Sequence, residues 1–180
     1  PASDRFSSDG WVVALFGGLE DILLQPNESR VIEIGFQSPN DVVGEMHVEL
    51  RVFASGARAA ERTARTVATI ERISSASASA NADGCSSMMP NTSCQTDITV
   101  ENTGNAYNTF VLRHKSTTGG FEVGVPSVGL VMQPGESKIF PSVVVNAPQE
   151  ASAFSLGSSV IEVLDDTGEV VDEVILEFTI

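Results

Sequence analysis

The sequence predicts an all-β protein made of two β-sandwiches in tandem, the first of them incomplete. Apolar and polar residues alternate with a period of two along several segments, which is typical of half-buried strands. Pro, Gly and Asn residues that favour turns separate these segments at short intervals. The sequence also repeats itself once, at an interval close to the length of a single sandwich domain.

The repeat consists of four short motifs that recur in the same order. The longest pair is QPNESR, which begins at Gln25, and QPGESK, which begins at Gln133. The other pairs are Gly10-Trp11 with Gly120-Phe121, Ser38-Pro39 with Ala147-Pro148, and Ala68-Thr69-Ile70 with Phe178-Thr179-Ile180. The interval stays near about 110 residues, the size of one sandwich. We expect its small drift to reflect short insertions and deletions in loops.

The repeat places the boundary between the two copies near residue 70. We interpret residues 1–70 as the C-terminal part of a first sandwich and residues 71–180 as a complete second sandwich. The first copy has no counterpart of roughly residues 71–110, and no initiator Met or signal peptide is seen. Three interpretations stay open: a segment of a longer protein, a proteolytic product, and a half-sandwich completed by another chain.

Strands are predicted in both copies from period-two patterns. In the first copy they cover 30–36 and 45–53, where Met46, Val48, Leu50 and Val52 alternate with charged residues. In the second copy we expect strands at 97–100, 108–112, 121–125, 138–145, 158–163 and 170–180. The QP(N/G)E motif predicts a turn in each copy because Pro fixes φ and Asn or Gly tolerates positive φ. Residues 165–168, DDTG, predict a hairpin loop.

One segment carries conflicting signals. Residues 57–73 are rich in Ala and Arg, which favours a helix. The repeat instead aligns residues 64–70 with the strand expected at 174–180. We predict a strand over 63–70 because tertiary context overrides propensity. Residues 71–76 are then a short linker, and the small, polar segment 74–82 is either linker or a frayed edge strand.

The second copy also resembles a known family. Asn102-Thr103-Gly104-Asn105 follows the strand at 97–100, and Gly120-Phe121, the QPGES turn and Ala147-Pro148 come next. This order is similar to that of the immunoglobulin-like repeats of bacterial and archaeal surface proteins, of the alpha-galactosidase-associated and cell-adhesion-related bacterial type. The resemblance implies tandem immunoglobulin-like sandwiches and an extracellular accessory or spacer role. It carries over no catalytic residue.

These motifs have direct physical roles. Trp11 and Phe121 are large apolar residues after Gly, and we expect them to fill corresponding core sites. Asn102 and Asn105 flank Gly104, where their side chains can bond the local backbone. Pro39 and Pro148 are expected to end strands or to start a crossover.

Composition narrows the function classes. The chain has 180 residues, 24 acidic against 10 basic ones, and a formal charge of −14. Nucleic-acid binding relies on Lys and Arg that neutralise phosphates, and docking to an anionic membrane relies on similar charge, so we expect neither partner. No apolar stretch is long enough to span a bilayer.

Cys85 and Cys94 enclose a short loop, and in an extracellular protein they predict a disulfide. The alternative is a pair of free buried thiols in a cytosolic protein. A zinc site would need more ligands than these cysteines and the distant His47 and His114 provide. Both histidines are interpreted as strand residues without a catalytic partner, so no cofactor is expected.

The acidic C-terminal run contains the metal candidates. Asp165, Asp166 and Glu169 lie in the predicted hairpin and have the hard oxygen ligands that calcium prefers. Residues 81–84, NADG, are a weaker candidate. The favoured interpretation of the run is a solvated sheet edge whose charge resists edge-to-edge pairing. Asn27 and Asn91 begin N-glycosylation sequons in predicted turns.

The leading function from sequence is a non-catalytic structural or interaction module of an extracellular protein. Its expected partners are other copies or neighbouring domains of the same surface protein, including a donated strand that completes the first domain. The alternative is a carbohydrate-binding or accessory module of a glycosidase, for which Trp11 and Tyr107 are the candidate aromatic residues. An enzyme is disfavoured because no nucleophile motif is present.

Overall fold

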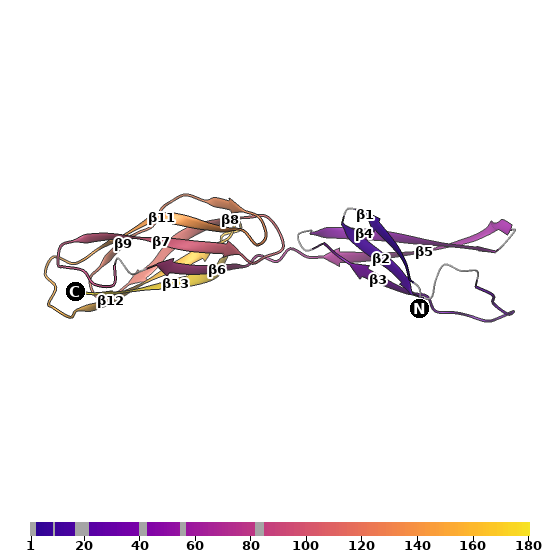
Figure 1. Ribbon diagram of the computed structural model, residues 1–180, viewed down its shortest axis with the longest axis horizontal. Coiled ribbons are helices and arrows are strands. Elements are labelled where there is room, and N and C mark those ends of the chain that lie inside the picture. Colours follow the sequence, from indigo (N-terminus) through magenta and orange to yellow (C-terminus); the bar gives the residue numbers. More distant parts are fainter. Residues whose placement is uncertain (1–2, 9, 17–21, 40–42, 55–56, 82–84) are drawn as a thin grey trace. The chain divides into compact units, whose positions relative to one another are not determined.

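The computed structural model describes residues 3–8, 10–16, 22–39, 43–54, 57–81 and 85–180 (Figure 1). All regular structure in these residues is β, and every strand pair is antiparallel. The chain divides into two compact units, Pro1–Glu71 and Arg72–Ile180, which we call unit 1 and unit 2. The described residues contain no helix long and apolar enough to cross a membrane.

Unit 2 contains two four-stranded sheets that enclose one core. The first sheet has the order β6-β7-β11-β9, with strands Ala76–Asn81, Ser93–Asn102, Ser137–Asn146 and Glu122–Gly124. The second has the order β10-β8-β12-β13, with strands Leu130–Met132, Asn108–Thr117, Leu156–Leu164 and Val170–Thr179. Large, fully buried residues from both sheets meet between them, including Ile98, Phe110, Phe140 and Phe178.

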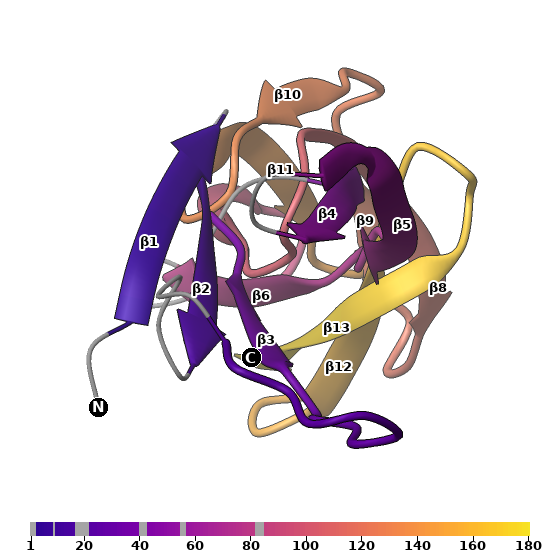
Figure 2. The ribbon, with the colours of Figure 1, turned by 90° about the vertical axis from the view of Figure 1, so that its right-hand side faces the viewer.

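Unit 1 contains a three-stranded sheet and a two-stranded ribbon (Figures 1 and 2). The sheet has the order β1-β2-β3, with strands Ser3–Ser8, Trp11–Phe16 and Glu33–Gln37. The ribbon pairs β4, Gly44–Ala54, with β5, Ala57–Ile70. Every second residue of β2 is buried, namely Trp11, Val13 and Leu15. The alternation is that of a strand with one face on a core.

The Ala- and Arg-rich segment is a strand, as the repeat predicts. β5 pairs with β4 from Gly44 opposite Ile70 to Val52 opposite Arg62. Cross-strand pairing therefore prevails over helix propensity in this segment. The small segment at 76–81 is also a strand, β6, and it forms the edge beside β7.

Sequence patterns missed three strands and misplaced several boundaries. β1 is short and polar, β2 was expected only to place Trp11 in the core, and β10 has only three residues. β3 begins at Glu33, whereas the pattern predicted a start at Arg30, and β5 and β7 begin several residues before their predicted starts. These differences arise because pairing partners, which the local pattern does not contain, decide where a strand starts.

The repeated QP(N/G)E motif folds into the same turn in both units. In unit 1 the Glu28 N–H donates to the Gln25 carbonyl at 2.9 Å, and the Gln25 N–H donates to Glu28 Oε2 at 2.7 Å. In unit 2 the equivalent bonds join Glu136 and Gln133 at 3.0 and 2.9 Å. The third motif residue has positive φ in each copy, 65° at Asn27 and 73° at Gly135. The sequence repeat is therefore also a structural one.

Strand registers repeat as well. Val12 lies opposite Gln37 between β2 and β3, just as Glu122 lies opposite Asn146 between β9 and β11. Val52 lies opposite Arg62, and its counterpart Val163 lies opposite Asp172. β2, β3, β4 and β5 are therefore the counterparts of β9, β11, β12 and β13.

The Gly-aromatic motif has the same surroundings in both units. Gly10 and Gly120 have positive φ, and a Cβ on them would lie 3.2 Å from Pro39 Cβ and 3.6 Å from Pro148 Cβ, respectively. The next residue, Trp11 or Phe121, is buried in each unit. This confirms the expected core role of both aromatic residues.

The number of residues that separates equivalent positions of the two copies changes once inside a strand. This corrects our expectation that such changes fall in loops. The segment after the turn has one residue more in unit 2 than in unit 1, and the register between β11 and β7 shifts between Phe140 and Val143. Ser142 has a φ of 65°, and its N–H donates to Asp97 Oδ1 at 3.2 Å. The extra residue is accommodated as a β-bulge, which inserts a residue without changing the faces beyond it.

Candidate functional site

Unit 1 leaves open the sheet edges that unit 2 fills. β11 is paired on both sides, with β7 and β9, and β12 is paired on both sides, with β8 and β13. Their counterparts β3 and β4 pair only with β2 and β5 among the described residues of unit 1. β1 aligns in sequence with the second half of β8, yet it pairs with β2 instead of β4. Unpaired N–H and C=O groups on such edges can accept a further strand.

Side chains beside these edges are exposed in unit 1 and buried in unit 2. Leu24 is 48% exposed, whereas its counterpart Met132 is fully buried. Val52 is 52% exposed, whereas Val163 is fully buried. In unit 2 these two positions lie beside β8, because Met132 is opposite Asn108 and Val163 is opposite Leu112. The exposure in unit 1 therefore follows from a missing neighbour, not from a different side chain.

Ile32, just before β3, and the core-facing residues of β3 show the same contrast. Ile32, Ile34 and Phe36 are half-buried. Their counterparts on β11 and just before its bulge, Phe140, Val143 and Val145, have no exposed surface. We call Leu24, Val52, these three residues and the unpaired edges of β3 and β4 the open surface of unit 1.

The disulfide expected from the sequence is present in unit 2. Cys85 and Cys94 are bonded, with their Cα atoms 5.6 Å apart. Cys85 is fully buried and belongs to the core cluster, so the bond fixes the loop before β7 against the sandwich interior. By the chain-entropy argument a loop this short contributes roughly 2–3 kcal/mol.

The segment that opens unit 2 is held by polar contacts. The Ser74 hydroxyl donates to Asp165 Oδ2 at 2.6 Å, and Asn108 Nδ2 donates to Ser74 Oγ at 2.7 Å. Arg72 forms an ion pair with Asp166 at 2.7 Å, and its guanidinium also donates to the Tyr107 carbonyl. Residues 72–75 are thus fastened to the DDTG hairpin and to the loop after β7.

The asparagines around Gly104 add further hydrogen bonds next to the segment that opens unit 2. Asn102 Nδ2 donates to the Ala106 and Met132 carbonyls, and its Oδ1 accepts the Gly104 N–H at 3.0 Å. Asn105 Oδ1 accepts the Ile73 N–H at 2.8 Å. A Cβ on Gly104 would lie 2.3 Å from the Ile73 carbonyl oxygen, so this position has no room for a side chain. Asn102 bonds the local backbone, as predicted, whereas this bond of Asn105 reaches the opening segment of unit 2 instead.

The calcium candidates of the DDTG hairpin are bound to protein donors. Besides Ser74, the buried Asp165 carboxylate accepts the Thr167 hydroxyl and the N–H groups of Thr167 and Glu169. Burial alone would raise the pKa of Asp165, but these hydrogen bonds outweigh it and lower the pKa to about 2. Asp165 therefore acts as a turn cap, and Asp166 is engaged by Arg72.

No three His, Cys, Asp or Glu side chains come together as a potential metal site within the described parts of the chain. Glu169 lies exposed at the hairpin and contributes its backbone N–H to Asp165. The weaker candidate at 81–84 falls largely on residues 82–84, which lie outside the described residues. Calcium binding at either place stays a hypothesis.

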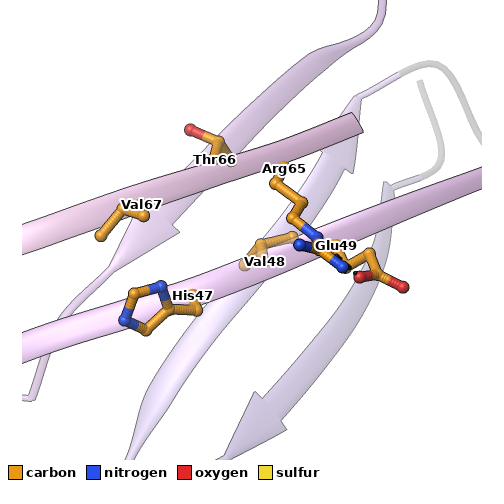
Figure 3. Close-up of a pocket in the computed structure, with 6 residues that line it drawn as sticks. All are labelled: His47, Val48, Glu49, Arg65, Thr66 and Val67. Carbon is orange, nitrogen blue, oxygen red and sulfur yellow. Dashed lines mark hydrogen bonds and ion pairs between the residues drawn. The ribbon is translucent and has the colours of Figure 1, made fainter. Parts of the chain in front are cut away.

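A shallow hollow on the β4-β5 ribbon gathers several polar residues (Figure 3). Arg65 reaches across the ribbon, and its Nε donates to Glu49 Oε2 at 2.9 Å. Hydrogen bonds from Arg51 and then Arg65 lower the pKa of Glu49. These contacts form an exposed cross-strand ion-pair group. The hollow is lined by His47, Val48, Glu49, Arg65, Thr66 and Val67.

The two histidines lie in separate units. His47 is exposed, with Nε2 3.3 Å from Glu45 Oε2. His114 is half-buried on β8 and contacts the Thr117 hydroxyl.

A second ion-pair group covers the outer face of the β8-β12-β13 sheet. Glu162 is buried beneath Arg113 and Lys115, with N···O distances of 2.6 and 3.2 Å. The Arg113 hydrogen bond lowers the pKa of Glu162 against the opposing effect of burial, with help from Lys115. Lys115 also pairs with Glu173 on β13. The group joins three neighbouring strands, which gives it a structural role.

The remaining candidates differ in accessibility. Asn27 and Asn91 both lie exposed in positive-φ positions, and their glycosylation stays a prediction. Trp11 is buried and unavailable to a ligand, whereas Tyr107 is 66% exposed and its hydroxyl donates to Gln133 Oε1 at 3.2 Å. Local patterns could not identify the open surface, because it depends on which edges are paired among the described strands of unit 1.

The chain is similar to a solved protein, but no family is assigned. No family model matches the sequence, and no curated protein matches it. A FixG-related protein from Vibrio parahaemolyticus matches 59% of this chain and 97% of its own length in structure, at 15% identity and a TM-score of 0.42. We draw no functional argument from a likeness of this degree.

Proposed function

We propose that the chain is a non-catalytic structural and interaction module of a secreted or cell-surface protein. Its fold would be two immunoglobulin-like sandwiches in tandem, the first of them incomplete. The observation that carries this proposal is that the same arrangement of strands occurs twice. Its sheet edges are paired in unit 2, whereas the equivalent edges among the described residues of unit 1 are unpaired. A closed sandwich suits a spacer, and an open one suits assembly with a neighbour.

The strand order of unit 2 supports the immunoglobulin-like assignment. The order β6-β7-β11-β9 corresponds to A-B-E-D of an immunoglobulin sandwich, and β8-β12-β13 corresponds to C-F-G. β10 adds a short strand beside β8, as a C′ strand does. The order in the chain differs in one respect, because β9 at the D position precedes β10 at the C′ position.

Two features of unit 2 support an extracellular location. Structural disulfides persist in oxidising compartments, and Cys85–Cys94 is buried on one side by the core. Three carboxylates of the C-terminal run, Asp172, Glu173 and Glu177, lie on β13, an edge strand, where charge discourages pairing with other chains. In this proposal the partners are other copies or neighbouring domains of the same surface protein, including a donated strand.

Force spectroscopy on the full chain tests the spacer role. Unit 2 should resist force and unfold in one step, because its two sheets share one core. After reduction the step should lengthen by the loop that Cys85 and Cys94 enclose, and a Cys85→Ser/Cys94→Ser variant should show the longer step without reductant. Gradual extension of unit 2 at low force, with no discrete step, would contradict the spacer role.

A second candidate is a carbohydrate-binding accessory module, favoured by the exposed ring of Tyr107. Exposed aromatic rings stack on sugars, and Gln133 beside the Tyr107 hydroxyl offers a hydrogen-bonding amide. A glycan array tests this candidate with Tyr107→Ala and, as matched control, Phe154→Ala, which removes another exposed ring. Binding lost only in the Tyr107 variant would favour the carbohydrate role, and no binding by the parent chain would exclude it.

A further inference from the structure

We propose that the open surface of unit 1 binds an extended polypeptide segment, from outside residues 1–180, with the chemistry of residues 93–112. The inference rests on the proposed role as an interaction module and specifies its ligand. Residues 93–112 comprise β7, the following loop and the first half of β8, which together occupy the equivalent positions in unit 2. The segment would run antiparallel to both β3 and β4.

The repeat defines the register of the segment. In unit 2, Ile98 lies opposite Phe140 and Thr96 lies opposite Val143. The counterparts of Phe140 and Val143 in unit 1 are Ile32 and Ile34. A residue like Ile98 would therefore lie opposite Ile32, and one like Thr96 would lie opposite Ile34.

The second part of the segment reaches the other exposed positions. Asn108 lies opposite Met132, the counterpart of Leu24, and Leu112 lies opposite Val163, the counterpart of Val52. One continuous segment thus reaches both Leu24 and Val52 of the open surface, although these residues are far apart in the sequence. Its side chains must alternate as those of β7 do, with Thr96, Ile98, Val100 and Asn102 buried and the residues between them less so.

A second copy of this chain fits the surface less well. β7 is enclosed between β6 and β11 within its own unit, so a copy could donate it only by opening a closed sandwich. Two copies could instead pair through their β3 edges, but such pairing would leave Leu24 without a partner, because its counterpart packs beside β8 in the other sheet. The repeat therefore favours a separate segment that enters both sheets.

A peptide with the sequence of residues 93–112 and Cys94 replaced by Ser is the probe. Titration calorimetry with the full chain should show saturable one-to-one binding. Leu24→Asp should weaken the affinity at least tenfold, because a carboxylate would be buried without a partner. Leu23→Asp is the matched control, since its counterpart Val131 stays exposed in unit 2, and it should change the affinity less than twofold. Both leucines are exposed in the free chain, so neither variant should unfold unit 1.

Three outcomes would overturn the inference: no saturable binding, equal losses in the two variants, and binding that persists when the peptide carries Asp in place of both Ile98 and Val100. Dimers of the chain that dissociate on Leu24→Asp would replace the segment by a second copy and would also overturn it. Each of these results leaves the force measurement on unit 2 unaffected, so failure of the segment and failure of the spacer role are distinguishable.

Discussion

Asp165 is the residue on which the polar contacts at the start of unit 2 converge. Its carboxylate accepts hydrogen bonds from Ser74, Thr167 and Glu169, and through Ser74 it fastens the segment after Glu71 to the sandwich. A buried carboxylate with this many donors is favoured in its charged form. The residue therefore links the closing hairpin of unit 2 to its opening segment.

The low pKa of Asp165 predicts a pH dependence of stability. The folded pKa, about 2, lies below the ordinary value of 3.8, so the contribution is present above pH 4 and is lost as pH falls toward 2. It amounts to about 2 kcal/mol. Denaturant unfolding between pH 5 and pH 2, followed through the single Tyr, which lies in unit 2, should show this loss.

Asp165→Asn provides the control for that measurement. It should be less stable than the parent at pH 5 and should lack this part of the acid dependence. An identical acid profile in the variant would show that other carboxylates determine it.

At the scale of elements, the QP(N/G)E turn explains why the third residue of the motif can be Asn in one copy and Gly in the other. Both Asn27 and Gly135 have positive φ, which Gly and Asn adopt far more readily than other residues. A Cβ on Gly135 would meet no atom within 4 Å, so a substitution there has a conformational cost and no steric one.

The equivalence of the two turns predicts a large effect for one substitution and a small effect for another. Gly135→Val should destabilise unit 2 by about 1–2 kcal/mol, because a β-branched residue is strained at positive φ. Asn27→Gly should change unit 1 by only a few tenths of a kcal/mol, since Gly already occupies the equivalent position. Urea unfolding read by Tyr107 for unit 2 and by the single Trp for unit 1 separates the effects. Equal destabilisation by both changes would contradict the equivalence of the turns.

The sequence was most informative where a residue's role is local or repeated. The Gly-Trp and Gly-Phe anchors, the paired turns and the Cys85–Cys94 bond were all predictable, because spacing and residue type determine them. The repeat also predicted β5 against its helix propensity. β1 could not be predicted, because its counterpart in unit 2 pairs with β12 whereas β1 pairs with β2. The bulge at Ser142 and the cap at Asp165 depend on partners far away in the sequence.

At the scale of the whole molecule, one arrangement of strands occurs twice and is more complete in unit 2 than in the described residues of unit 1. Unit 2 pairs β11 and β12 on both edges and buries its core residues fully. Unit 1 reproduces the registers of four strands, and among its described residues β3 and β4, the counterparts of β11 and β12, are each paired on one edge only. This difference is the basis of the proposed role in assembly.

Amide hydrogen exchange on the free, monomeric chain tests this difference most directly. Along an antiparallel strand, the N–H groups of successive residues point to alternate sides. We expect slow exchange at successive residues over 144–146 of β11 and 159–164 of β12, where each strand is paired on both sides. In β3 and β4 we expect alternation, with slow exchange only at residues whose N–H groups face β2 or β5. Uniform protection along β3 and β4 would contradict the central claim that their outer edges are open.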